Sequence, residues 1–280
     1  MASDSKFAVL IDADNISGKY IKIILDEISN DGIATYKRIY GDWTSPALVS
    51  WKNVLLDNSI LPIQQYSYTT GKNSTDSAMI IDAMDILYSG QVDGFCIVSS
   101  DSDFTRLAAR LRESGMTVVG MGERKTPKSF ISACNRFKYL DILATAEQKE
   151  PEKPVHPEKS KQQPKQEKAR NAPKQEPKPE PKPEPEPVPE PCPEPEEKQM
   201  TGLRTIKKAI RTIVAENSDE DGWLFIGTIG NLLVKRYPDF DVRNFGFSKL
   251  TPFIESLDLF DIKSVRTRDS SVKLIYVKLK

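Results

Sequence analysis

The sequence predicts an α/β fold: a mostly parallel, three-layer sandwich, followed by a small winged-helix (α+β) domain. Three observations predict it. Residues 1–146 alternate short apolar runs with amphipathic stretches, the rhythm of βαβ units in a parallel sheet. Residues 147–198 contain 15 of the 20 prolines and almost nothing apolar to bury. Residues 199–280 return to a globular composition, with helical patterns first and strand patterns last.

Five apolar runs in residues 1–146 predict the strands of the sheet. Each run is short and bounded by polar or turn-forming residues, as expected of strands buried on both faces. The five runs are Phe7–Ile11, Ala34–Tyr40, Leu61–Gln65, Phe95–Val98 and Thr117–Gly120.

Helical patterns separate these runs. In residues 20–28, Ile21, Ile24, Leu25 and Ile28 share one face, and Ser45-Pro46 supplies an N-cap and a first turn for a helix ending near Asp57. The polar loop 69–73 precedes a further helix. The remaining helices are expected at Thr75–Leu87, at Phe104–Ser114 and after Thr126-Pro127, where a short last helix begins.

The proline-rich segment 147–198 is expected to be a disordered linker, because it lacks apolar side chains to offset the entropy of ordering. Repeated Pro-Glu-Pro-Lys units favour an extended tether of at most ~150 Å at ~3.1 Å per residue. A partner that binds the proline repeats is the alternative interpretation.

Residues 199–280 predict three helices and a terminal hairpin. Leu203–Ala215 is amphipathic, a second helix stops at Pro238, and a third runs to about Leu257. Phe260–Val265 and Val272–Leu279 are expected to pair as antiparallel strands. This order is typical of winged-helix modules, which bind nucleic acid or dock to proteins.

Charge and rare residues narrow the function. Residues 1–146 carry 15 basic and 17 acidic side chains, a net charge of −2, whereas residues 201–280 carry 14 and 10, a net charge of +4. This division suits catalysis in the first domain and contact with a polyanion in the second. The only histidine, His156, lies in the linker, which argues against Ser-His-Asp hydrolysis, histidine-pair RNA cleavage and His-ligated zinc.

The three cysteines, of which Cys96 falls in a predicted strand, are scattered and odd in number. They favour a reducing, cytoplasmic location over a disulfide framework. No apolar run approaches the length of a membrane span, and residues 1–6 show no signal-peptide pattern.

Acidic residues follow two of the predicted strands. The first strand ends in Asp12, Asp14 and Asn15, and the fourth leads into Asp101 and Asp103. Ligands of open α/β sheets gather at the carboxyl ends of the strands. A fifth acid, Asp76, begins the helix at 75–87 on its core-facing side.

Helical angles separate Asp76 from the other acids of its helix. At about 100° per residue, Asp82 and Asp85 lie about 120° and 180° from Asp76 and are expected to lean towards solvent. Taken singly, Asp76, Asp101 and Asp103 could simply cap helices. Converging at one edge of the sheet, however, these carboxylates would repel one another unless a cation lay between them. Oxygen ligands without His or Cys select Mg²⁺ or Mn²⁺.

Three motifs, LIDADN, KNSTDSAMIIDAMD and IVSSDSDF, resemble the acidic motifs of NYN domains, the PIN-like nuclease group that includes the LabA/DUF88 proteins. The resemblance covers about residues 5–143 and implies a PIN-like fold, divalent metal binding and cleavage of RNA. Asp12, Asp76, Asp101 and Asp103 match the family's catalytic and metal-binding acids, and Asn15 matches its asparagine. Asp82 also matches a recurrent acid but, like Asp14, is kept as a peripheral candidate.

Residues 199–280 resemble the OST-HTH/LOTUS domain, chiefly through Asn244–Leu250, NFGFSKL, and the run Phe253–Phe260. That resemblance implies RNA binding or, in some members, docking to a protein. Together the two resemblances imply a Mg²⁺- or Mn²⁺-dependent (endo)ribonuclease with single-stranded or structured RNA as its partner. The lack of a long apolar run argues against a membrane partner. Asn15 and Ser100 are the candidates to orient water or a phosphate oxygen, and Lys72 and Arg124 to reach the RNA backbone.

Two other functions remain open. A haloacid-dehalogenase-like phosphatase also begins with two acids after its first strand and uses Mg²⁺, but here Asn15 and Ile16 follow Asp14 where that family usually has Thr or Val two residues on. The non-enzymatic alternative is an RNA-binding or regulatory scaffold with weak or absent catalysis.

Overall fold

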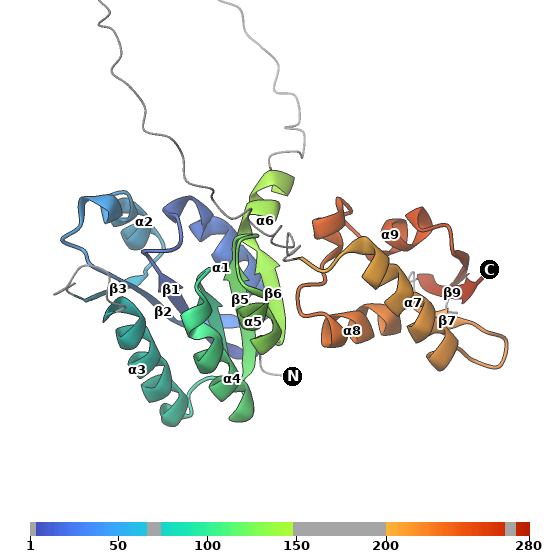
Figure 1. The fold of residues 1–280 in the computed structure, drawn as a ribbon, viewed down its shortest axis with the longest axis horizontal. Coiled ribbons are helices and arrows are strands. Elements are labelled where there is room, and N and C mark those ends of the chain that lie inside the picture. The colour runs from blue at the N-terminus through green and yellow to red at the C-terminus, as the bar shows by residue number, and fades with distance from the viewer. Residues whose placement is uncertain (1–3, 66–73, 148–199, 267–272) are drawn as a thin grey trace, which may run out of the picture. The chain divides into compact units, whose positions relative to one another are not determined.

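A computed structural model describes residues 4–65, 74–147, 200–266 and 273–280 of the chain. Its larger sheet has six strands, all parallel, in the order β3-β2-β1-β4-β5-β6 (Figure 1). The strands are β1 Lys6–Asp12, β2 Ile33–Gly41, β3 Leu61–Gln64, β4 Gly94–Val98, β5 Thr117–Gly122 and β6 Arg136–Tyr139.

Helices cover both faces of this sheet, which makes the predicted three-layer sandwich. Because side chains alternate along a strand, Phe7, Val9 and Ile11 of β1 enter one apolar core while Ala8 and Leu10 enter the other. The first core is closed by α1 Ile21–Ser29, α2 Trp51–Asp57 and α6 Leu140–Glu147. The second is closed by α3 Ser74–Ser89, α4 Thr105–Glu113 and α5 Lys128–Ala133.

The order of strands reverses between β1 and β4. The chain runs outward from β1 to β2 and β3, then returns through α3 to β4 on the other side of β1. In open α/β sheets, ligands bind outside the carboxyl ends of the strands at such a switch point. Asp12 ends β1, and the segment Ser99–Asp103 follows β4, so the predicted acids lie at this point.

Residues 203–266 and 273–279 form three α-helices and a small antiparallel sheet of order β7-β9-β8. Their bounds are α7 Leu203–Asn217, β7 Leu224–Phe225, α8 Ile226–Arg236, α9 Leu250–Ser256, β8 Phe260–Arg266 and β9 Lys273–Leu279. They enclose an apolar core of their own, in which Ile210, Ile229, Phe253 and Val277 are fully buried. The winged-helix prediction is confirmed in its three helices and its terminal hairpin.

Some elements differ from the prediction. Thr126-Pro127 does precede a helix, α5, but the Thr126 hydroxyl donates to the carbonyl of Glu123, and α5 is not the last helix. Two elements beyond α5 were not predicted from the sequence: β6, at the edge of the sheet, and α6, which begins at the next residue. The two-residue strand β7 was not predicted either. The predicted linker lies outside the described residues. Within those residues, no helix has the length and apolar character that a membrane crossing requires.

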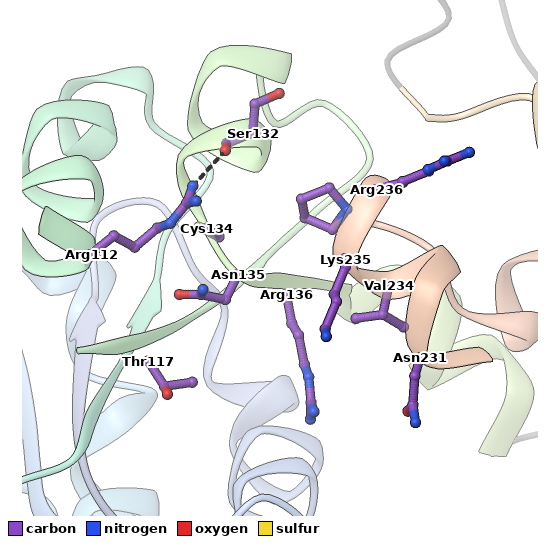
Figure 2. Close-up of a pocket in the computed structure, with 11 residues that line it drawn as sticks. Arg112, Thr117, Ser132, Cys134, Asn135, Arg136, Asn231, Val234, Lys235 and Arg236 are labelled. Atoms are coloured by element: carbon purple, nitrogen blue, oxygen red, sulfur yellow. Dashed lines mark hydrogen bonds between the residues drawn. The ribbon is translucent and has the colours of Figure 1, made fainter. Parts of the chain in front are cut away.

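The helices on the second face brace one another near the amino ends of β5 and β6. Figure 2 shows Arg112, in the last turn of α4, directed at the carboxyl end of α5. Its guanidinium donates to the carbonyls of Ser132 (3.1 Å) and Ala133 (3.2 Å). A cation among the last carbonyls of a helix is favourable. Thr117 and Arg136, also labelled in Figure 2, start β5 and β6, so this contact lies at the edge of the sheet opposite the acids.

Candidate active site

Asp12 is the last residue of β1 and is 1% exposed. Its Oδ1 accepts hydrogen bonds from the main-chain amides of Asp14 (3.1 Å) and Asn15 (3.3 Å). Its Oδ2 accepts from Asn15 Nδ2 and from Ser99 Oγ, both at 2.7 Å. Burial raises the pKa of Asp12, and the hydrogen bonds from Ser99 and Asn15 oppose that rise. Four donors therefore hold this carboxylate in one orientation and favour its ionised form.

Ser99 links the ends of β1 and β4. It is fully buried; its hydroxyl donates to Asp12 and accepts from the amide of Asp101 at 3.0 Å. Asp101 in turn accepts from the amide of Asp103 at 2.9 Å and caps the short 3-10 helix Ser102–Phe104. A chain of hydrogen bonds thus fixes the segment after β4 relative to Asp12.

Asp76, Asp101 and Asp103 come together although they belong to different segments. Each offers one carboxylate oxygen, and these oxygens all lie within 4.8 Å of one another. Asp76 comes from the first turn of α3 and is 9% exposed, whereas Asp101 is half-buried and Asp103 exposed. The sequence prediction that Asp76 lies on the core-facing side of its helix is confirmed.

The electrostatics of this cluster favour a positive ligand. Burial, followed by the charges of Asp12, Asp101 and Asp103, raises the pKa of Asp76 from 3.8 to about 6. A cation among the three oxygens would remove the repulsion that causes part of this shift. Carboxylate oxygens at this spacing suit a hard divalent ion such as Mg²⁺ or Mn²⁺, so the residues present fit the metal that the sequence implied.

The structure gives Asn15 and Ser100 specific partners. The side-chain amide of Asn15 donates a hydrogen bond to Asp12 and so orients that carboxylate. Ser100 is 8% exposed, and its hydroxyl oxygen accepts from the amide of Glu123 at 2.9 Å. This bond joins the segment after β4 to the loop after β5.

The other substrate-binding and peripheral candidates lie outside the cluster or outside the described residues. Lys72 is among the residues that the structure does not describe. Arg124 is exposed and pairs with Asp141 in the first turn of α6, at 3.3 Å between Nε and Oδ2. Asp14 is exposed beside the site and adds to the repulsion on Asp76.

The expectation that Asp82 leans towards solvent is wrong. Its carboxylate accepts hydrogen bonds from the guanidinium of Arg38 and the hydroxyl of Tyr40, both on β2, and its side chain is 20% exposed. Burial and the neighbouring Asp82 carboxylate also raise the pKa of the Tyr40 phenol. Asp82 therefore fastens α3 to β2, whereas Asp85, three residues on, is exposed as expected.

Ser99 and Gly122 matter to the site and were missed in the sequence. The register between β1 and β4 pairs Ile11 with Val98, so Asp12 and Ser99 come next on adjacent strands, but no pattern within either strand gives this register. At the end of β5, a Cβ on Gly122 would lie 2.6 Å from the carbonyl oxygen of Ser99 and 2.6 Å from Thr126 Oγ1. Only glycine allows β5 to approach the site so closely.

Two family models match parts of the chain. The NYN domain model matches residues 6–141, and the OST-HTH/LOTUS domain model matches residues 202–272. A search of curated protein sequences finds no significant match. Among solved structures, the chain is similar to a protein of unknown function from Vibrio parahaemolyticus, with 18% identity, 50% of this chain and 94% of that chain covered, and a TM-score of 0.42.

NYN domains are a PIN-like nuclease family, and OST-HTH/LOTUS domains bind RNA. Three oxygens gathered where β1 and β4 end, on an open parallel sheet, are in keeping with the first of these matches. The chain thus carries an NYN domain at residues 6–141 and an OST-HTH/LOTUS domain at residues 202–272.

Proposed function

We propose that the protein is a Mg²⁺- or Mn²⁺-dependent endoribonuclease whose site is built from Asp12, Asp76, Asp101 and Asp103. The observation that carries this proposal is the trio of carboxylate oxygens within 4.8 Å of one another at the switch point of the sheet. The NYN match supports a nuclease, and the OST-HTH/LOTUS match supports RNA as the substrate. We also propose domain boundaries near residues 146 and 199, and a reducing, cytoplasmic setting, supported by the buried free thiols of Cys96 and Cys134.

Some residues of the site would hold the metal ion, and others orient the carboxylate of Asp12. Asp76, Asp101 and Asp103 would hold the ion through their three gathered oxygens, and Asp12 adds a charge near enough to act on Asp76. Ser99 and Asn15 orient Asp12 and favour its ionised form, because each donates to its Oδ2 at 2.7 Å. A bound divalent ion would supply the charge that activates the attacking water and stabilises the phosphate and the leaving oxygen.

Substrate contacts outside the cluster are part of the same proposal. The guanidinium of Arg124 is 63% exposed, on the loop between β5 and α5, and could exchange Asp141 for a phosphate of the RNA backbone. Lys72 precedes α3 in sequence, close to Asp76, and is kept as a second candidate of the same kind.

The geometry does not favour a haloacid-dehalogenase-like phosphatase. That chemistry needs the first aspartate as a nucleophile, with an oxygen free to attack phosphorus. Here both oxygens of Asp12 are occupied by donors and the residue is 1% exposed. A scaffold with weak catalysis would differ from the nuclease only in its rate of RNA cleavage, which a cleavage assay measures.

The test is to incubate the full-length protein with a mixed RNA pool in Mn²⁺, in Mg²⁺ and in excess chelator. The wild type should cut RNA only when a divalent ion is present, and Asp101→Asn and Asp12→Asn should each abolish cutting. Asp85→Asn is the matched control, because it removes one carboxylate from the exposed face of α3 and should leave the rate unchanged. Cleavage that survives both Asp101→Asn and Asp12→Asn, or that proceeds equally in chelator, would refute the proposal.

A further inference from the structure

The outward face of α7 carries a row of four basic side chains. At about 100° per residue they fall within about 100° of arc, opposite the buried face that includes Ile206 and Ile213. We call them the α7 basic row: Arg204, Lys207, Lys208 and Arg211. At 1.5 Å per residue the row is about 10 Å long.

The row has no counter-charge within the part of the chain that the structure describes. None of its members forms a salt bridge there, and the single acid of α7, Glu216, lies in the last turn and pairs with Arg236 at 3.4 Å. Four like charges on adjacent turns repel one another weakly in water and gain most from an external polyanion.

The surface between these charges is hollowed. The four side chains border a depression of about 490 Å³ that Thr212 and Leu259 also line. Leu259, which precedes β8, is half-buried and gives the depression an apolar floor. Long basic side chains can lay their methylene stems on such a floor and keep their charged ends outward.

The helix that winged-helix modules commonly use for recognition is poorly suited to phosphate here. α9 is the third helix of the domain, and its sequence, LTPFIES, contains no Lys or Arg. Phe253 and Ile254 are buried in the core, and Glu255 is exposed and would repel phosphate. The domain's strongest run of unpaired positive charge on a single helix is therefore on α7.

We propose that the α7 basic row is the surface through which this domain binds the phosphate backbone of single-stranded RNA, without reading its bases. The inference rests on the proposed function for its choice of RNA as the polyanion, and it adds the contact surface and the mode of recognition. A row of about 10 Å spans about three phosphates at 3.4 Å each along a stacked strand. The row offers no aromatic anchor of the kind that dominates protein interfaces, which favours a nucleic acid over an acidic protein.

This mode of binding has a measurable signature. Each phosphate neutralised on a single strand contributes about −0.7 to the slope of log K against log salt concentration. Three or four contacts along α7 therefore contribute about 2 to 3 to the magnitude of that slope. Because no base is read, poly(U) and mixed-sequence RNA should bind with similar affinity.

The test measures binding of fluorescein-labelled poly(U) to the full-length protein by fluorescence anisotropy across a salt series. Chelator is present throughout, so a failure of cleavage and a failure of binding are separate results. One variant replaces the row with Gln, a helix former comparable to Lys and Arg. The matched control removes four exposed charges from the start of α9 and the hairpin: Lys249→Gln, Lys263→Gln, Arg266→Gln and Lys273→Gln.

The row variant should raise the Kd at least tenfold and lower the magnitude of the salt slope by about 2 to 3, while the control changes the Kd less than threefold. Arg204→Lys with Arg211→Lys keeps the point charges and should bind like the wild type.

Thermal unfolding checks that each variant is folded. If the fourfold variant is not folded, Lys208→Gln with Arg211→Gln should give about half the change in slope. An unchanged Kd in a folded row variant, or an equal loss in the control, overturns the proposal.

Discussion

Asp76→Asn should stabilise the metal-free protein at neutral pH. In the folded chain, burial and the charges of Asp12, Asp101 and Asp103 raise the pKa of Asp76 from 3.8 to about 6. The difference of about 2 between the two values corresponds to about 3 kcal/mol of penalty on the ionised form at pH 7. Asn has nearly the same shape and no charge, so the substitution removes that penalty.

The sign of the pH dependence follows from linkage. Between pH 4 and 6 the folded state binds a proton at Asp76 that the unfolded state has released, so the wild-type stability falls as the pH rises through this window. Above pH 7 the full penalty of about 3 kcal/mol applies, and below pH 4 it is absent. The advantage of Asp76→Asn should therefore be large at pH 7.5 and small at pH 4.5.

The assay is thermal unfolding in excess chelator at both pH values. A gain of about 3 kcal/mol corresponds to a rise of about 6–12 °C in the melting temperature for a domain of this size. Asp85→Asn is the control, because it removes one charge from the exposed face of the same helix and should shift the melting temperature by less than about 1 °C. Saturating Mn²⁺ should raise the melting temperature of the wild type more than that of Asp76→Asn. An Asp76→Asn protein that is less stable than the wild type at pH 7.5, or equally shifted at both pH values, would refute the electrostatic account.

Three further predictions concern the supports of the site. Asp82→Asn should lower stability by about 1–2 kcal/mol in urea unfolding, the opposite sign to Asp76→Asn, because it weakens the bonds from Arg38 and Tyr40; a stabilised protein would contradict this. Ser99→Ala should move the acid limb of the pH–rate profile to higher pH, because Asp12 loses a donor to its ionised form, and an unmoved limb would count against it. Gly122→Ala should cost about 1–3 kcal/mol in thermal unfolding and reduce cleavage, since its Cβ would clash with the carbonyl of Ser99; wild-type stability would show that β5 can give way.

Much of the sheet could be predicted from the sequence because buried parallel strands leave apolar runs of recognisable length. β1 and β4 are such runs, and the acids that follow them mark their carboxyl ends. The segment 136–147 escaped because Arg136–Tyr139 is a short edge strand with two basic residues, and α6 starts at the very next residue without a turn signal. Without a turn signal, the pattern of apolar residues alone cannot locate the change from the strand period of 2 to the helix period of 3.6.

The acidic residues of the site could be predicted from the sequence, but the residues that position them were harder to predict. Helical periodicity placed Asp76 on the buried side of α3 but misplaced Asp82, because the angle between two residues says nothing of which strand lies beneath the helix. Tyr36, Arg38 and Tyr40 alternate along β2 and face α3, so a polar partner for Asp82 follows only once β2 is known to lie there. The hydrogen bonds of Ser99 likewise depend on the register of β1 with β4, which no local pattern determines.

The four acids differ in their hydrogen-bond donors and in the charges around them, and this difference affects how the site can work. Asp12 is surrounded by donors, so the fold fixes its position, although burial still raises its pKa. The pKa of Asp76 is also raised by burial and, unlike that of Asp12, by the charges of several neighbouring carboxylates, so its preferred state depends on whether a cation is present. Metal binding can therefore relieve repulsion around Asp76 while the fold keeps Asp12 in place, so Asp76→Asn should stabilise the metal-free protein whereas Asp12→Asn should abolish cleavage.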